Sequence, residues 1–181
     1  MRAGTETRIW TWEEFQRLPD EPGVAYEFVD GELWVTPPPT EYHNEILARL
    51  NAILVPYVVA QGLGLVYLPR AAFRAGRGTQ LEPDLMVRQP HPDRRGSWET
   101  APRPILVVEV VSPSSRRRDY GRKRDIYTEH VIPEYWIVDG DERSVTVAQP
   151  GRDPIAVRDV LTWNPAGARE PLTFTLSQLF G

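Results

Sequence analysis

Residues 105–111 form an uninterrupted apolar run that contains one carboxylate, Glu109. A run this apolar, without polar alternation, is typical of a central β-strand that is covered on both faces. An ionised carboxylate in such a strand costs several kcal/mol unless it is paired or binds a metal ion. The sequence therefore predicts a sheet with this strand at its centre. It leaves two explanations for Glu109, which are a buried ion pair with an arginine and a functional site.

A second carboxylate, Asp84, follows Pro83 and precedes another strand-like segment, residues 85–88. A Pro-Asp pair alone is typical of a turn and does not indicate a functional site. Asp84 becomes a candidate site residue because we expect Glu109 on a neighbouring strand. Two carboxylates and a main-chain carbonyl offer the hard oxygen ligands that suit Mg²⁺ or Mn²⁺. Zinc is disfavoured, because the chain has three histidines and no cysteine.

Only one of the 21 basic residues is a lysine, Lys123. Asp119, Lys123 and Tyr127 follow one another at four-residue spacing, which places them on one face of the helix predicted after the Glu109 strand. Lys123 could lean over the carboxylates and stabilise charge on a phosphate. The alternative is an ordinary surface ion pair with Asp119.

The pattern of apolar residues and turns predicts a mixed sheet flanked by helices, an α/β (α+β) fold with the core order α-β-β-β-α-β from residue 40 onward. An extra helix and hairpin precede it, with Asp30-Gly31 as the hairpin turn. We expect one domain over residues 1–181, divided into an N-terminal helix and hairpin (10–36), a core (40–139), and C-terminal strands and tail (143–181). Helices are expected at 11–18, from residue 40 to Gly62 or Gly64, and at 116–130. Strands are expected at 25–29, 32–36, 63–69, 71–74, 85–88, 105–111, 135–138 and 144–148, a loop at 91–103, and a strand or short helix at 172–179.

Composition bounds the function only loosely. The net charge of −4 gives no overall attraction to nucleic acid, and the absence of cysteine is compatible with a cytoplasmic location. No apolar run approaches the roughly 20 residues that span a bilayer, so we expect no membrane segment. Basic residues gather locally, however, and the segment 112–131 holds five arginines besides Lys123: Arg116, Arg117, Arg118, Arg122 and Arg124. They could hold a phosphate backbone or form intrahelical ion pairs on a solvated helix.

These residues resemble the PD-(D/E)XK superfamily of restriction-endonuclease-like nucleases. The whole chain is similar to one bacterial endonuclease branch, once catalogued only as a domain of unknown function. The segments that carry the resemblance are 26–33, the helix with His43, 82–85, 107–114, Lys123 with Tyr127, and 131–139. The chain departs from the superfamily pattern at Val111, where lysine normally stands two residues after the acid. In this branch the lysine has migrated to the following helix.

The resemblance implies a restriction-endonuclease-like fold in which Asp84, Glu109 and the backbone carbonyl of Val110 bind the metal and Lys123 is catalytic. It also places Glu27 near the cluster, as a supporting or third acidic group. His43 and Tyr127 match positions of the family, but the residues give them no role, and packing explains them equally well.

The leading hypothesis is an Mg²⁺-dependent DNA endonuclease, with Mn²⁺ as a possible substitute, that cleaves phosphodiester bonds through a metal-activated water. The five arginines would then contact phosphates, and a homodimer is expected because two strands must be cut. Trp10, Trp12 and Trp98, which we expect to be exposed, could serve packing, an interface or base stacking. Two alternatives stay open: a nonenzymatic nucleic-acid-binding or scaffold protein on an inactivated nuclease fold, and a glycoside hydrolase that uses the acidic pair.

Overall fold

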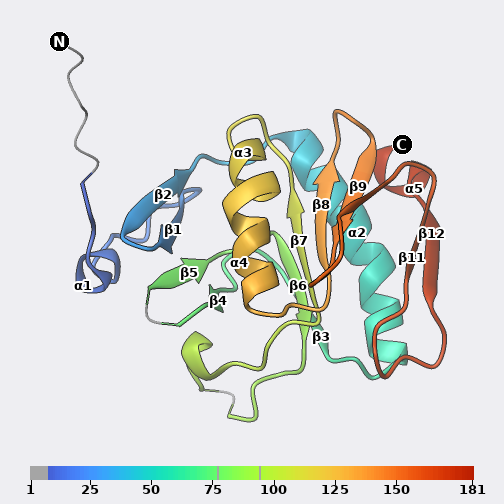
Figure 1. Ribbon diagram of the computed structural model, residues 1–181, viewed down its shortest axis with the longest axis horizontal. Helices are drawn as coiled ribbons and strands as arrows, with labels where there is room; N and C mark the ends of the chain where they lie inside the picture. The colour runs from blue at the N-terminus through green and yellow to red at the C-terminus, as the bar shows by residue number, and fades with distance from the viewer. Residues whose placement is uncertain (1–7, 77, 94) are drawn as a thin grey trace.

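The computed structural model describes residues 8–76, 78–93 and 95–181, and contains a six-stranded sheet, a four-stranded sheet and a two-stranded ribbon (Figure 1). Residues 1–7, 77 and 94 of the expected domain lie outside the described residues. The strand order is β10-β9-β8-β7-β6-β3 in the large sheet and β2-β1-β5-β4 in the small one. The restriction-endonuclease-like mixed sheet flanked by helices, predicted from the sequence, is confirmed.

The large sheet and the helices around it make up the core. Its strands are β3 (Leu65–Tyr67), β6 (Leu85–Arg88), β7 (Leu106–Val110), β8 (Tyr135–Asp139), β9 (Ser144–Ala148) and β10 (Ile155–Val157). The helical elements are α2 (Glu41–Ala60), the 3₁₀ turn η1 (Trp98–Thr100), α3 (Arg116–Arg118), the π-helical turn η2 (Asp119–Lys123), α4 (Arg124–Glu129) and α5 (Ser177–Phe180). Because β4 and β5 belong to the other sheet, the large sheet receives three strands between α2 and α3, as the predicted core order requires.

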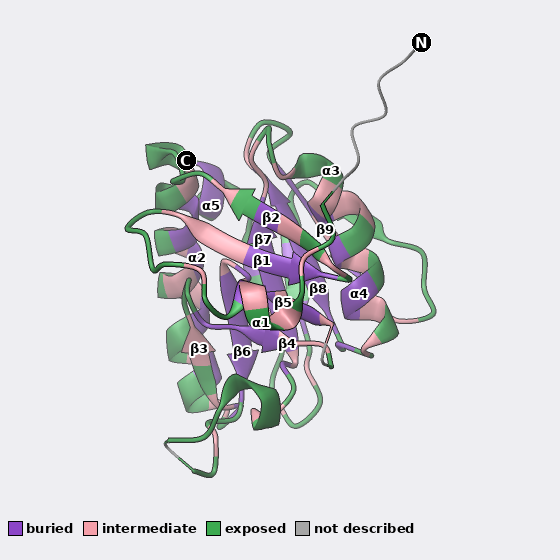
Figure 2. Cartoon of the chain, turned by 90° about the vertical axis from the view of Figure 1, so that its left-hand side faces the viewer, coloured by how far each residue is buried: buried purple, intermediate pink, exposed green. Residues whose placement is uncertain are grey.

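The remaining elements build the small sheet and the ribbon. They are α1 (Trp12–Phe15), β1 (Ala25–Val29), β2 (Glu32–Thr36), β4 (Phe73–Arg74), β5 (Thr79–Leu81), β11 (Val160–Trp163) and β12 (Leu172–Thr175). The hairpin β1–β2 turns at Asp30 and Gly31, which both have positive φ angles (50° and 88°), the backbone of the tight turn that the Asp-Gly pair predicts. This hairpin lies beside the large sheet and covers one end of it (Figure 2).

Strand β7 lies in the middle of the large sheet, antiparallel to β6 and parallel to β8, and all five of its residues are buried. Successive side chains of a strand point to opposite faces. Leu106, Val108 and Val110 therefore pack against the side of α2, whereas Val107 packs with Ile126 of α4. Glu109 lies on the same face as Val107 and so points toward η2 and α4.

Helix α2 begins after Thr40, whose hydroxyl accepts a hydrogen bond from the backbone N–H of His43. Its buried residues recur at three- and four-residue spacing, as on one face of a helix: Ile46, Leu47, Leu50, Leu54 and Val58. The chain leaves the helix at Gly62, where φ is +68°. One face of α2 thus covers the sheet, and its first turn brings His43 toward the end of β6.

Two expectations need correction, and a third is refined. The predicted helix over 116–130 is interrupted, because the backbone at Gly121 is not helical (φ −111°, ψ −107°) and residues 119–123 form a π turn. Strands β5, β10 and β11 were missed because they are only three or four residues long, too short for a clear apolar pattern. The tail 172–179 holds both expected alternatives, strand β12 and helix α5.

Candidate active site

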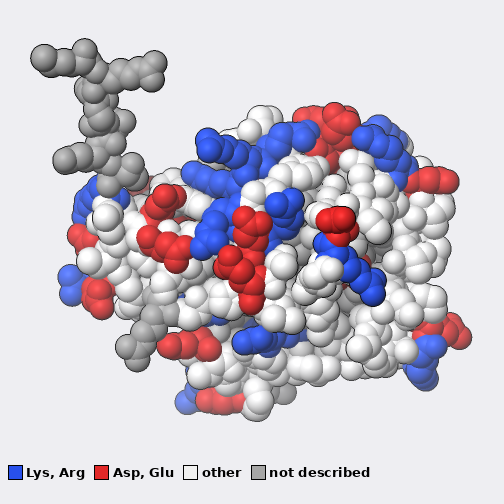
Figure 3. All heavy atoms as spheres, viewed as in Figure 1, with Lys and Arg blue, Asp and Glu red and all other residues white. Residues whose placement is uncertain are grey.

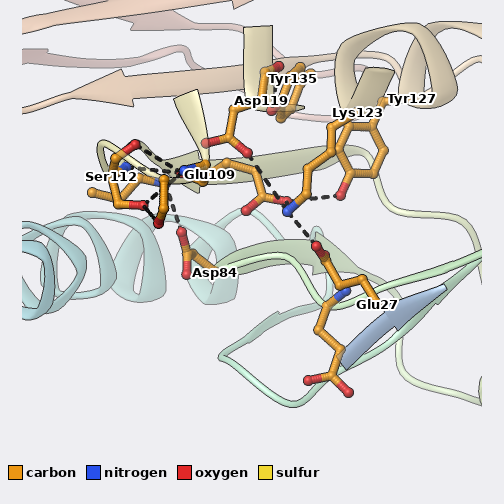
Figure 4. Close-up of polar contacts among 12 residues, drawn as sticks. Glu27, Asp84, Glu109, Ser112, Asp119, Lys123, Tyr127 and Tyr135 are labelled. Carbon is orange, nitrogen blue, oxygen red and sulfur yellow. Dashed lines mark hydrogen bonds and ion pairs between the residues drawn. The ribbon is translucent and has the colours of Figure 1, made fainter. Parts of the chain in front are cut away.

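Asp84 and Glu109 come together because β6 and β7 are antiparallel neighbours. Leu85, the first residue of β6, pairs with Val108 of β7. In an antiparallel pair the residue before Leu85, Asp84, therefore lies opposite the residue after Val108, Glu109. The Oδ2 atom of Asp84 accepts a hydrogen bond from the backbone N–H of Val110 at 2.8 Å. This bond fixes Asp84 against β7, beside Glu109 (Figure 4).

Lys123 reaches this cluster from η2. Its Nζ atom lies 2.8 Å from Oε1 of Glu109, 3.0 Å from Oε1 of Glu27 and 3.7 Å from Oδ1 of Asp119. The alternative of a surface ion pair is wrong, since Lys123 and its three partners are all buried. The predicted approach of the helical lysine to the acidic pair is thus present in the structure.

Glu27 and Tyr127 complete the contacts of this cluster. Glu27 projects from β1, and its Oε1 atom also accepts a hydrogen bond from the backbone N–H of Glu82 at 2.9 Å. The hydroxyl of Tyr127 donates to Oε1 of Glu109 at 3.1 Å. One carboxylate oxygen of Glu109 therefore receives both the lysine and the tyrosine, which orients the carboxylate and leaves Oε2 free of these two donors.

Asp119 is the residue whose environment the sequence did not reveal. Its side chain is 1% exposed, yet neither carboxylate oxygen accepts a hydrogen bond within the described part of the chain. Burial raises its pKa to about 6, and the attraction of Lys123 opposes that shift. The four-residue spacing to Lys123 was visible in the sequence, but the loss of every hydrogen-bond donor depends on the tertiary fold.

His43 contacts the other acid. Its Nε2 atom lies 3.1 Å from Oδ2 of Asp84, and its Nδ1 atom is buried without a partner among the described residues. Burial by itself lowers the pKa of His43, but the contact with Asp84 outweighs this and raises it above the ordinary value. Asp84 is thus held from two sides, by the β7 backbone and by α2.

The cluster carries more negative charge than its lysine neutralises. Burial raises the pKa of Glu109 well above its ordinary value; Lys123 opposes the shift, while Asp119, Asp84 and Glu27 add to it. Burial lowers the pKa of Lys123, but Glu109, Glu27 and Asp119 more than reverse this and raise it well above its ordinary value. A buried excess of carboxylates is the electrostatic setting in which a divalent cation is favoured.

The residues present fit such a cation in charge and chemistry. Asp84 and Glu109 supply oxygen ligands on adjacent strands, and Val110 lines the same pocket. Within residues 8–76, 78–93 and 95–181, no three carboxylate or imidazole side chains converge as a finished ligand set. Two side chains with a backbone carbonyl, as the sequence resemblance implies, therefore remain the predicted arrangement.

A pocket of about 390 Å³ opens over these groups. Its floor includes Asp84, Glu109 and Lys123, and its walls include the proline segment 37–39 and Pro113. Glu82, to which the sequence assigned no role of its own, also lines it; burial raises the pKa of that carboxyl, and Arg70 opposes the shift. Its position directly before Pro83-Asp84 was the available signal.

Basic side chains gather over α3, with acidic ones beside them (Figure 3). The five arginines predicted to contact phosphates divide into those that form ion pairs within the protein and those that do not. Arg116, Arg122 and Arg124 already form ion pairs, with Asp139, with Asp30 and Glu129, and with Asp125, respectively. Arg117 and Arg118 form none within the described residues. Those two are therefore the better placed to bind an external anion.

Comparisons with known proteins agree with this fold. A family model described as "Uma2: Putative restriction endonuclease" matches residues 12–176. The chain is similar in structure to a protein from Anabaena variabilis described as a "putative nuclease belonging to DUF820", with a TM-score of 0.80 and 22% sequence identity. That match covers 94% of this chain and 97% of the other, and at this identity it shows the fold. No curated protein matches the chain.

Proposed function

We propose that this chain, which belongs to the Uma2 family, is a nuclease that hydrolyses phosphodiester bonds of DNA with the help of Mg²⁺ or Mn²⁺. The observation that carries the proposal is the buried contact of Lys123 with Glu109, at the floor of a pocket that Asp84 also lines. A lone lysine among several buried carboxylates is costly for the fold, and perturbed groups of this kind gather at functional sites.

Asp84 and Glu109, with the Val110 carbonyl, would hold the cation. A bound divalent cation acidifies a water molecule and neutralises the charge of the phosphate. Lys123 would then act directly on the substrate, because its ammonium group lines the pocket and can stabilise the charge that develops on phosphorus oxygens. Glu27 and Tyr127 would position Lys123 and Glu109, and His43 would position Asp84.

The test is cleavage of a pool of labelled DNA substrates, which includes single strands, duplexes and branched molecules, with Mg²⁺, with Mn²⁺ and with excess EDTA. We expect metal-dependent cleavage that is lost in Asp84→Asn while DNA binding is retained. Binding without cleavage in the wild-type protein would favour the nonenzymatic alternative. Cleavage that survives EDTA would contradict the proposed use of a metal.

None of the described helices has the length and hydrophobicity needed to cross a bilayer.

The homodimer stays a prediction. It was expected because both strands of a duplex must be cut, and sedimentation equilibrium of the purified chain would test it.

A further inference from the structure

A second hollow lies next to the catalytic pocket, between the β1–β2 hairpin and the segment α3–η2. We call it the arginine groove; its volume is about 880 Å³. Four arginines and two tryptophans line it: Arg8, Arg117, Arg118, Arg122, Trp10 and Trp34. Trp10 and Trp34 are not freely exposed, since Trp34 is buried and Trp10 is half-buried.

Arginine side chains cover the faces of both tryptophans. The guanidinium of Arg8 lies 4.0 Å from the ring centre of Trp10, and that of Arg118 lies 4.9 Å from the ring centre of Trp34. Arginine stacked on an aromatic ring presents a flat cationic surface on which a base or a phosphate can rest.

Two carboxylates in the groove, Asp30 and Glu32, have internal partners. Asp30 forms an ion pair with Arg122, and Oε2 of Glu32 accepts a hydrogen bond from Nε1 of Trp34 at 2.9 Å. Glu32 keeps its negative charge, since Trp34 is neutral, and Arg8 also forms an ion pair with Glu14. The lining nevertheless holds four arginines against two carboxylates, and Arg117 and Arg118 form no ion pair within the described part of the chain, so the lining has a positive surplus. A groove of this charge suits a polyanion.

Arg118 joins the groove to the site, because it lines both the arginine groove and the catalytic pocket. A polyanion that runs along the groove therefore arrives over the carboxylates and Lys123. A charged groove with aromatic stacking partners is the usual construction of a surface for single-stranded nucleic acid.

The depth of the reacting groups points to the same ligand. Glu109, Lys123 and Glu27 are each at least 95% buried, and even the side chain of Asp84 is only 20% exposed. The pocket above them, about 390 Å³, has the size of pockets that enclose one small molecule, in the range of roughly 300–1,000 Å³. A nucleotide in a duplex would have to leave its stack and its partner to enter, whereas an unpaired nucleotide enters without this cost.

We propose that the substrate is an unpaired strand of DNA, which runs along the arginine groove and places one nucleotide in the catalytic pocket. The proposal rests on the nuclease function proposed above and names its substrate class. Free ends, flaps and gaps present such strands, while a continuous duplex does not.

The experiment compares three substrates of one sequence with wild-type protein and Mn²⁺: a single strand, a blunt duplex, and a duplex with a single-stranded flap. We expect the single strand and the flap to be cut at least about tenfold faster than the duplex, with the flap cut on its unpaired side. Equal or faster cleavage of the duplex would overturn the proposal and leave the nuclease function intact.

Binding of a fluorescent single strand, measured by anisotropy with EDTA present, distinguishes failure of the proposed groove from failure of the proposed nuclease function. We expect Arg118→Ala and the more exposed Arg117→Ala each to weaken binding about fivefold and to reduce its salt dependence. The control is Arg152→Ala, an exposed arginine between β9 and β10 and outside both hollows, which should bind as the wild type does. Unchanged binding in both groove variants would overturn the proposed groove. Arginine-dependent binding with no cleavage of any substrate would support the groove and overturn the nuclease function.

Discussion

Two aspartates of this chain, Asp119 and Asp139, are equally buried, at 1% exposure each, but their surroundings are opposite. Asp139 ends β8 and accepts three contacts: from Arg116 at 2.6 Å, from the hydroxyl of Tyr120 at 3.2 Å and from the backbone N–H of Glu142 at 3.1 Å. Asp119 accepts no hydrogen bond within the described residues, and its nearest cation, Lys123, lies 3.7 Å away.

The difference separates a structural carboxylate from one that the fold tolerates at a cost. A buried carboxylate with donors on its oxygens stabilises the chain around it, whereas one without donors keeps its full desolvation penalty. Proteins retain such costly groups mainly where a function needs them. Asp119, beside Lys123, is of the second kind, and Asp139 is of the first.

The largest effect is expected for Glu109→Gln, which removes the charge and keeps the shape. Cleavage should fall by about 1,000-fold, since both the cation and Lys123 lose their central partner. The rate is measured under single turnover on the best substrate. The control is Glu134→Gln, because Glu134 is also buried but accepts hydrogen bonds from Trp136 and Gln149. Equal losses in both variants would break the distinction between functional and structural carboxylates.

The next effect concerns the only lysine. Lys123→Arg keeps the positive charge but puts a planar fork where a compact ammonium contacts Glu109 and Glu27. We expect cleavage to fall about 100-fold while DNA affinity changes little, which single-turnover kinetics and anisotropy would resolve. An active arginine variant would show that any nearby cation suffices.

Asp139→Asn tests the structural member of the pair. The amide cannot serve the ion pair with Arg116, and one of its two acceptor positions is lost to an NH₂ group. We expect urea unfolding to show a loss of about 2 kcal/mol. A loss near zero would mean that the three contacts of Asp139 contribute little.

The smallest effect, and one of opposite sign, is expected for Asp119→Asn. In the metal-free protein at pH 7 this variant should be more stable than the wild type by about 1 kcal/mol, because the folded-state pKa near 6 lies above the ordinary value of 3.8. An acid whose pKa is raised by folding lowers the free energy of unfolding only above its unfolded-state pKa, and this cost reaches its full size above its folded-state pKa. The advantage of the variant should therefore be absent below pH 4, grow between pH 4 and 6, and stay constant above. Thermal melts across this range in EDTA would check it, and a destabilised variant at pH 7 would contradict it.

The sequence predicted those parts that local pattern determines. The apolar run around Glu109 and the Asp30-Gly31 turn both reflect neighbours within a few residues, and they appear where expected. The alignment of Asp84 with Glu109 followed from placing two strands side by side. The candidate site was therefore recognisable before the fold was known.

Other parts depend on distant contacts. Strand β5 has only three residues and exists through pairing with β1 and β4. The π turn at Gly121 breaks the helical register that the sequence predicts, yet Lys123 still faces Glu109. Asp119 lies against β8, where the hydroxyl of Tyr135 donates to its backbone carbonyl at 3.1 Å, and no local pattern reveals the burial of its carboxylate there.

The most direct test of the account is Mn²⁺ binding by calorimetry at pH 7 to the wild-type chain, Glu109→Gln and Glu134→Gln, without DNA and again with a non-cleavable phosphorothioate strand. We predict one site per chain that Glu109→Gln abolishes and Glu134→Gln retains, because Glu109 lines the pocket together with Asp84 and Val110, whereas Glu134 lies outside that pocket. Equal binding by all three proteins, or no binding in either condition, would contradict the claim that this cluster is a cation site.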